Sequence, residues 1–449
     1  MTGIDNHIEK IQSLLLLELP TVQIIGIWGM GGIGKTTIAN AIFKKLATQF
    51  RSASIIQNVK QEIERAGLDH VKSKYLSKLL GEDNKSSEYN ISIDPRLKRM
   101  KVLLVFDDVK DSDQLKDLIG THSNFGQGSR IIVTSRDRHV LENAHADEIY
   151  QVREMGYQAS QQLFCSFAFK QKQPIESYVS LTEKFLKYAG GLPLALKVLG
   201  SLLYGKTKEV WESQLQKLEK LPDQDILKSL KLSYDGLDKE QKDIFLDIAC
   251  FHIGEYAKVV EQMLDGCGYS AARIGMEVLK DRCLIFISVG CIWMHDLIQE
   301  MGQAIVLLED DPRKRSRLWK TNDIYDVLSK KKGKGTDAIK GISLNMREIE
   351  EIQLDADTFN EMHNLRMIKF HSGGFVTMSN VTCSDHLKFP NNLKYLYWDG
   401  FPLRSLPQDF WPEDLIMLEM RDSHLEQLWE GDLVLHFKLY VVSFCVLMI

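Results

Sequence analysis

The chain has 449 residues, of which 44% are hydrophobic and 26% are charged, and this composition is that of a globular protein. Length alone favours about three domains. The net charge of −5 argues against a general nucleic-acid binder. The seven cysteines include no Cys-x-x-Cys pair, which favours reduced thiols in the cytoplasm over a disulfide or zinc framework.

Targeting and membrane signals are weak along the chain. Met1 leads into a mixed polar helix, so we expect no secretory signal. No stretch reaches the ~18 apolar residues that a bilayer span needs. Residues 433–449 come nearest, but His436 and Lys438 interrupt them, and we interpret 432–449 as an atypical apolar tail.

A glycine-rich stretch, Gly29–Thr36, fits the P-loop pattern G-x-x-x-x-G-K-[ST]. An apolar run at 22–28 predicts a buried strand before it, and helical apolar spacing over 36–50 predicts a helix after it. Glycines let the backbone wrap around phosphate oxygens; Lys35 can reach the β- and γ-phosphates, and the Thr36 hydroxyl can ligate Mg²⁺. The residues predicted to bind nucleotide here are Gly29, Met30, Gly31, Gly32, Ile33, Gly34, Lys35, Thr36 and Thr37. A turn that binds nothing is the alternative, which the complete motif in this context disfavours.

Before the P-loop, residues 4–17 have apolar side chains on one helical face, and Pro20 ends that helix. This helix either leans over the nucleotide or only packs against the sheet, and the sequence favours neither.

Two further strands are expected to end at the same edge of the sheet. Lys101–Asp108 is an apolar run followed by two carboxylates, a Walker B pattern that places Asp107 on Mg²⁺ and Asp108 on an attacking water. Ser129–Arg136 is another apolar strand, and Arg136 at its exit is a candidate γ-phosphate sensor rather than a merely solvated arginine. Up to about residue 150 the alternation predicts a doubly wound parallel sheet, the α/β P-loop NTPase fold.

Helices replace strands after residue 150. Core candidates over 157–190 are Leu163, Phe164, Phe167 and Phe169. Gly190-Gly191 ends one helix and Pro193 begins the next. Residues 284–294 read as a hairpin around Gly290, which after several helices predicts a winged-helix domain. Its helices carry few basic residues, so DNA binding is disfavoured.

The last part repeats a leucine spacing of the leucine-rich-repeat type. Three units share it, with apolar residues at Leu365, Ile368 and Phe370, at Leu393, Leu396 and Trp398, and at Leu415, Leu418 and Met420. Each unit should supply one strand to the start of a solenoid. The basic stretch before these units is interpreted first as a solvated linker and second as a docking face for an acidic partner or a membrane. Its members are Arg313, Lys314, Arg315, Arg317, Lys330, Lys331, Lys332 and Lys334.

With these motifs placed, the chain resembles plant intracellular immune receptors of the nucleotide-binding leucine-rich-repeat family, in the subgroup that begins with a Toll/interleukin-receptor-like (TIR) domain. The motifs that carry the resemblance are GIWGMGGIGKTTIA from Gly26, VLLVFDDV from Val102 with Asp111 after it, GSRIIVTSRDRHVL from Gly128, GGLPLAL from Gly190, FLDIACF from Phe245, WMHDLIQEMG from Trp293, LKYLYWDGFPLRSLP from Leu393 and LEQLWEG from Leu425.

The resemblance implies a switch that binds ADP at rest and ATP, with Mg²⁺, when active. It implies that Pro193 packs beside adenine and that His295 contacts the ADP β-phosphate. The TIR domain is missing and the repeats are truncated, so we expect no NAD-cleaving activity and at most slow ATP hydrolysis. Implied partners are copies of itself, other immune receptors, and a pathogen effector or guarded host protein, in the cytoplasm or nucleus.

The predicted domains are 1–150 (P-loop), 151–235 (helical), 236–335 (winged helix), 336–431 (truncated repeats) and 432–449 (tail). Three other functions stay open at this point. A turnover ATPase would hydrolyse ATP rapidly, and a nucleic-acid-binding regulator would show salt-dependent DNA affinity. A scaffold that uses only the repeats would have a small binding face.

Overall fold

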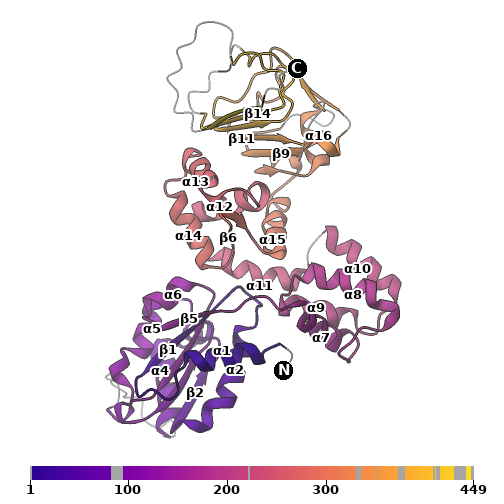
Figure 1. Ribbon diagram of the computed structural model, residues 1–449. Helices are drawn as coiled ribbons and strands as arrows, with labels where there is room; N and C mark the ends of the chain where they lie inside the picture. The colour runs from indigo at the N-terminus through magenta and orange to yellow at the C-terminus, as the bar shows by residue number, and fades with distance from the viewer. Residues whose placement is uncertain are drawn as a thin grey trace. The chain divides into compact units, whose positions relative to one another are not determined.

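The chain divides into two compact units, and each is described by itself (Figure 1). The computed structural model describes residues 3–81, 95–220, 223–329, 335–349, 351–372, 380–407, 410, 415–428 and 441–445, with only the backbone at 219–220 and 441–445. Unit 1 comprises Met1–Leu237, Val278–Ile285 and His295–Leu297. Unit 2 comprises Asp238–Glu277, Phe286–Met294 and Ile298–Ile449. The winged-helix part of the sequence therefore contributes two short segments to unit 1.

A five-stranded, all-parallel sheet forms the centre of unit 1, in the order β2-β3-β4-β1-β5. Its strands are β1 (Gln23–Trp28), β2 (Ser52–Ile56), β3 (Val102–Phe106), β4 (Arg130–Ser135) and β5 (Glu148–Gln151). Since β3, β4 and β1 are neighbours, the residues that follow them meet at one edge of the sheet. The predicted doubly wound P-loop fold is confirmed.

Helices cover both faces of this sheet (Figure 1). They are α1 (Asp5–Leu14), α2 (Lys35–Leu46), α3 (Val59–Ala66), α4 (Leu68–Leu80), α5 (Ser112–Ile119) and α6 (Arg138–Asn143). On β3, Val102, Leu104 and Phe106 join an apolar core with α4, α5 and α6, because alternate side chains of a strand share one face. Helix α2 contacts β1, β3 and β4, and α1 packs on α2.

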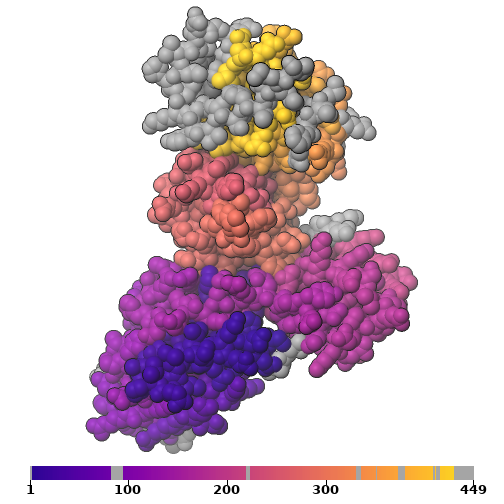
Figure 2. Space-filling view, in the orientation of Figure 1, coloured from indigo at the N-terminus to yellow at the C-terminus, as the bar shows by residue number. Residues whose placement is uncertain are grey.

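A helical module completes unit 1. Its helices are α7 (Tyr157–Ala168), α8 (Val179–Ala189), α9 (Pro193–Leu203), α10 (Lys208–Lys220) and α11 (Gln224–Asp235). Pro193 is the first residue of α9, as predicted, and Gly190 and Gly191 before it have positive φ. Phe164 is buried against Phe185 and Trp211, but Leu163 and Phe167 are only half-buried. Figure 2 shows the magenta surface of this module beside the indigo surface of the N-terminal residues.

Unit 2 begins with helices and a hairpin. The elements are α12 (Lys239–Phe251), α13 (Ala257–Gly266), α14 (Ala272–Asp281), the antiparallel β6 (Phe286–Ser288) and β7 (Cys291–Trp293), α15 (Asp296–Leu307) and α16 (Thr321–Leu328). Helices α14 and α15 each include residues of both units. The hairpin forms where the sequence predicts it, with Val289 and Gly290 at positive φ in its turn.

A second parallel sheet follows, in the order β15-β14-β13-β11-β9-β8. Its strands are β8 (Arg317–Leu318), β9 (Gly341–Asn345), β11 (Met367–His371), β13 (Tyr395–Trp398), β14 (Met417–Arg421) and β15 (Val441–Cys445), while β10 (Ile352–Leu354) pairs with β12 (Val381–Cys383). The three predicted repeat units supply β11, β13 and β14, which pair side by side in parallel. Their apolar side chains, including Ile368, Leu396 and Leu418, share one core. Assignment to a leucine-rich-repeat solenoid stays a prediction.

The interpretation of the basic stretch as a solvated linker is wrong for part of it. Arg317 is buried and pairs with Asp243 and Asp247, and Arg315 pairs with Asp323. A buried guanidinium needs such carboxylate partners, which come from α12 and α16 and are invisible in the local charge pattern. Lys330–Lys332 and Lys334, and the apolar tail apart from the backbone of β15, lie outside the described residues.

No helix among the described residues is long and apolar enough to cross a bilayer. The predicted domain boundaries stay predictions, since the two compact units cut across them.

Candidate functional site

The P-loop folds as a tight turn between β1 and α2. Gly32 has φ +78° and Gly34 has φ +100°, values that side chains other than glycine rarely adopt. A Cβ atom at Gly32 would lie 2.8 Å from the Leu194 side chain of α9. One at Gly31 would lie 2.8 Å from Arg136 Nη1. The glycines therefore serve both the curvature of the loop and its close contact with α9 and Arg136.

The ammonium group of Lys35 lies inside this loop. Its Nζ donates to the carbonyl oxygens of Gly29 and Met30, at 2.7 and 2.9 Å. Burial first, and Arg136 second, lower the pKa of Lys35 to about 8. A phosphate group bound in the loop would favour the charged form, so lysine and anion would stabilise each other.

Thr36 and the Walker B aspartate are brought together, although 71 positions separate them. Thr36 Oγ1 donates to Asp107 at 2.9 Å, and Thr134 Oγ1 donates to Asp107 at 2.7 Å. Burial raises the pKa of Asp107, against the lowering effect of these two hydroxyl groups. A hydroxyl and a carboxylate at the end of the phosphate site are hard oxygen donors, which fit Mg²⁺. Thr36 and Asp107 would hold such an ion.

Asp108 and Arg136 form an ion pair beside the P-loop, with 3.5 Å between Arg136 Nε and Asp108 Oδ1. Asp108 has a positive φ of 59°, and its amide donates to Thr134 Oγ1 at 2.9 Å. Arg136 Nη1 donates to the carbonyl of Ser229 in α11 at 2.8 Å. Arg136 thus joins the end of β4 to the helical module, and the alternative of a merely solvated arginine does not hold.

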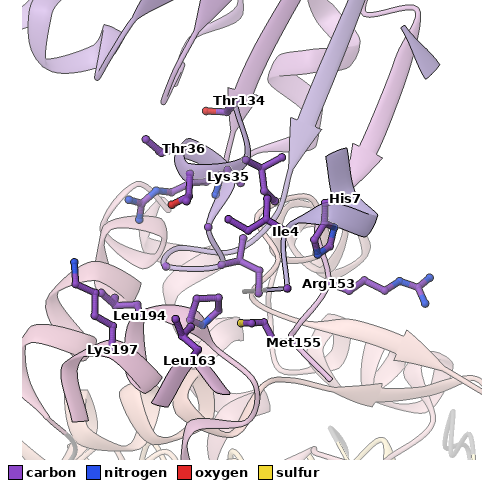
Figure 3. A pocket seen from close by; sticks show the side chains of 18 of the residues that line it. Ile4, His7, Lys35, Thr36, Thr134, Arg153, Met155, Leu163, Leu194 and Lys197 are labelled. Carbon is purple, nitrogen blue, oxygen red and sulfur yellow. The ribbon is translucent and has the colours of Figure 1, made fainter. Parts of the chain in front are cut away.

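One cavity of about 500 Å³ opens on the P-loop (Figure 3). Its volume lies within the usual range for small-molecule sites. The predicted residues that line it are Gly32, Ile33, Gly34, Lys35, Thr36, Thr37, Asp108, Arg136 and Pro193. Its other end is mainly apolar, with Ile4, Met155, Leu163, Phe167 and Leu194. The cavity is therefore polar where phosphates would lie and apolar where a base would lie.

Several lining residues escaped the sequence analysis. His7, Arg153, Met155 and Lys197 carry no motif, and Leu163 and Phe167 were interpreted as core. Lys197 could have been found, because it lies one helical turn after Pro193 on the same face. Ile4 and His7 show that the N-terminal helix lies at the cavity and does more than pack on the sheet.

Five predicted site residues do not line the cavity. Gly29 and Met30 take part through their carbonyl groups, Gly31 lies against Arg136, and Asp107 is fully buried at Thr36. His295 lies against the helical module: its Nε2 donates to the Gly190 carbonyl at 3.2 Å, and its Nδ1 accepts from the Leu297 amide at 3.1 Å. These two bonds require the neutral ring, and burial lowers its pKa. Its predicted contact with ADP stays a prediction.

Comparison with known proteins agrees with this geometry. Residues 4–174 match the NB-ARC domain, and residues 238–309 match the winged-helix domain of Roq1-like disease resistance proteins. The disease resistance proteins RPV1 and RUN1 of Vitis rotundifolia are 38% and 36% identical over 459 and 461 residues, which cover 96% of this chain and 33% and 34% of theirs. The TMV resistance protein N of Nicotiana glutinosa is 38% identical over 440 residues, covering 96% of this chain and 37% of its own.

The chain spans 33–37% of the length of these three relatives. Two domain matches in the same order as the P-loop sheet and the hairpin, together with this identity along nearly all of the chain, point to one assignment. Residues 4–174 form an NB-ARC nucleotide-binding domain, and 96% of the chain is similar to part of the plant disease-resistance proteins that carry one.

Proposed function

We propose that this chain is the nucleotide switch of an intracellular plant immune receptor, off with ADP and on with ATP. The observation that carries the proposal is the single cavity that the P-loop, the ends of β3 and β4, helix α1 and helix α9 line together. A ligand that touches all of these elements can hold them in one arrangement. A nucleotide can control the conformation of the chain only if it contacts several of its elements, and this cavity allows that.

The two ends of the cavity suit different parts of a nucleotide. Loop amides, the N-terminus of α2 and Lys35 suit the phosphates. The apolar end, with Ile4, Leu163 and Pro193, suits a purine base. When bound, Mg²⁺ would neutralise charge on the phosphate oxygens, and Thr36 and Asp107 would hold it. This combination of polar and apolar lining therefore fits an adenine nucleotide better than a free phosphate or an apolar ligand.

Switching needs a contact that distinguishes ADP from ATP, since a ligand shifts an equilibrium only through its difference in affinity. Arg136 is the candidate, because it already binds Asp108 and the Ser229 carbonyl and would have to share its charge with a γ-phosphate. His295 at Gly190 is the candidate for holding the ADP form. Inverting a 1:99 population requires a difference of about 5.5 kcal/mol, which several such contacts can supply together.

The decisive experiment denatures the purified chain and identifies the released nucleotide by chromatography. We expect close to one ADP per chain. Lys35→Ala should come out empty, while Lys44→Ala, an exposed lysine on the same helix, should keep its ADP. A Lys35→Ala protein that retains ADP would refute the site.

The rate of hydrolysis separates the switch from a turnover ATPase. A switch should hydrolyse at most about one ATP in minutes and keep the product, whereas a turnover enzyme works at about 1–10³ s⁻¹. Asp108 could orient an attacking water in a switch or in a turnover ATPase, so the measured rate of hydrolysis decides between these two functions.

We propose further that the chain acts in the cytoplasm and that ATP favours self-association. The similarity to plant disease-resistance proteins supports both proposals. Size-exclusion chromatography with ADP and with a non-hydrolysable ATP analogue tests the second, and an equal elution volume would contradict it. A fluorescent fusion tests the location.

A further inference from the structure

A second, smaller cavity in unit 1 has no assigned ligand. It measures about 60 Å³ and lies where the ends of β3 and β4 meet α3, α11 and the Val278–Ile285 segment. Asp108 and Arg136 line both this cavity and the nucleotide cavity, so their ion pair belongs to a shared wall. At 10–15 Å³ for each water, the space holds about four to six waters or one tetrahedral oxyanion.

Positive charge predominates in its lining. The cations are Lys60, Lys110, Arg136 and Arg282, against the two carboxylates Asp108 and Asp137. Each arginine already faces one carboxylate, at 3.5 Å for Arg136 with Asp108 and 3.4 Å for Arg282 with Asp137. Lys60 Nζ also lies 4.0 Å from Glu64, which is outside the lining. The two lysines therefore leave an excess of at least one positive charge, which suits a phosphate anion.

Two buried polar atoms in the same lining have no hydrogen-bond partner among the described residues. They are the hydroxyl of Ser233 and the Nε of Arg282. Arg282 Nε lies 3.4 Å from Asp137 Oδ2 in an ion pair that does not have hydrogen-bond geometry, and Arg282 Nη1 reaches the Ser233 carbonyl only at 3.5 Å. A buried donor without a well-placed acceptor destabilises the fold, so an acceptor in the cavity would stabilise these two groups.

We propose that this cavity binds one inorganic phosphate ion. Phosphate has four acceptor oxygens for Arg282, Ser233 and the two lysines, and it fills a space of this size. Water would accept hydrogen bonds from these donors but would not neutralise the excess positive charge. The proposal deepens the proposed function, because an anion here would hold the Asp108–Arg136 pair beside the nucleotide. Binding itself does not depend on a nucleotide.

The test is calorimetric titration of the full chain, loaded with ADP and Mg²⁺, with inorganic phosphate. One phosphate per chain should bind in addition to ADP. Arg282→Gln should weaken its affinity at least tenfold, and so should the double variant Lys60→Ala/Lys110→Ala, which changes only side chains outside the buried core. Lys44→Ala, remote from the cavity, should leave the affinity unchanged. An unchanged affinity in the double lysine variant overturns the proposal, even where Arg282→Gln fails to fold.

Two further arms separate this site from the P-loop and from an exposed phosphate-binding surface. Lys35→Ala should lose ADP and keep phosphate binding; a variant that loses both would show that phosphate had occupied the P-loop, and the proposal fails. O-phosphoserine carries a bulky substituent on its phosphate and should bind more weakly than phosphate; equal affinity for the two also overturns the proposal. Phosphate binding by a chain that never retains ADP would refute the nucleotide switch and support this site.

Discussion

Replacing Asp247 by asparagine removes one negative charge from a buried cluster of unit 2 without changing the size of the side chain. The carboxylate accepts from Arg317 Nε at 2.6 Å, from Arg366 Nη2 at 2.7 Å and from the Tyr269 hydroxyl at 2.7 Å. Arg317 lies on β8 and Arg366 immediately precedes β11, so Asp247 joins α12 to the second sheet.

The magnitude follows from the burial of the partners. Burial is the largest single effect and raises the pKa of Asp247. The charges of Arg317 and Arg366 together outweigh it and lower the pKa to about 2. The difference from the usual 3.8 corresponds to about 2 kcal/mol, at 1.36 kcal/mol for each pH unit. Removing one partner of a buried ion pair costs about 3–5 kcal/mol, because the other charge stays buried. We expect Asp247→Asn to destabilise unit 2 by about 2–5 kcal/mol.

Hydrogen exchange of the β9 and β11 amides measures the loss of stability in unit 2 alone. A local measurement is needed because a chain of two units has no single free energy of unfolding. A loss of about 2–5 kcal/mol speeds their exchange by about one and a half to three and a half orders of magnitude where unit 2 opens as a whole. Glu142→Gln is the matched control: it removes the exposed Arg138–Glu142 pair and should cost less than about 0.5 kcal/mol. Exchange within a factor of five of the parent protein in Asp247→Asn would refute the reasoning.

The same cluster predicts the sign of the pH dependence. The folded pKa lies below the unfolded one, so Asp247 stabilises fully above about pH 4 and loses that contribution as pH falls towards 2. Asp107→Asn should abolish the effect of Mg²⁺ on ATP affinity, measured by titration with and without EDTA. His295→Ala should raise the ADP dissociation rate about tenfold, measured with a fluorescent ADP analogue, while the exposed His139→Ala should not. Gly32→Ala should lose nucleotide binding by the same assay, while Gly67→Ala, which shares the positive φ but has open space around it, should keep nucleotide binding and lose about 1–3 kcal/mol of stability.

The sequence determined the local chemistry of the site. The P-loop and the strand–carboxylate pattern fixed Lys35, Thr36 and Asp107, because each motif lies within a few residues and its backbone geometry is local. Pro193 was found through its motif for the same reason. The leucine spacing predicted three parallel strands, since each repeat unit encodes its own strand and core side chains.

Tertiary structure alone decided which distant residues meet. Arg317 looked like part of a solvated basic run, yet Asp247, 70 positions away, lies in contact with it. Leu163 and Phe167 have ordinary core spacing, but the packing of α7 and α9 exposes them to the nucleotide cavity. Burial and long-range pairing depend on how elements pack, and a single sequence records only the periodicity of each element. Contacts between elements therefore could not be predicted from the sequence. The second cavity is an example, because residues from several elements line it.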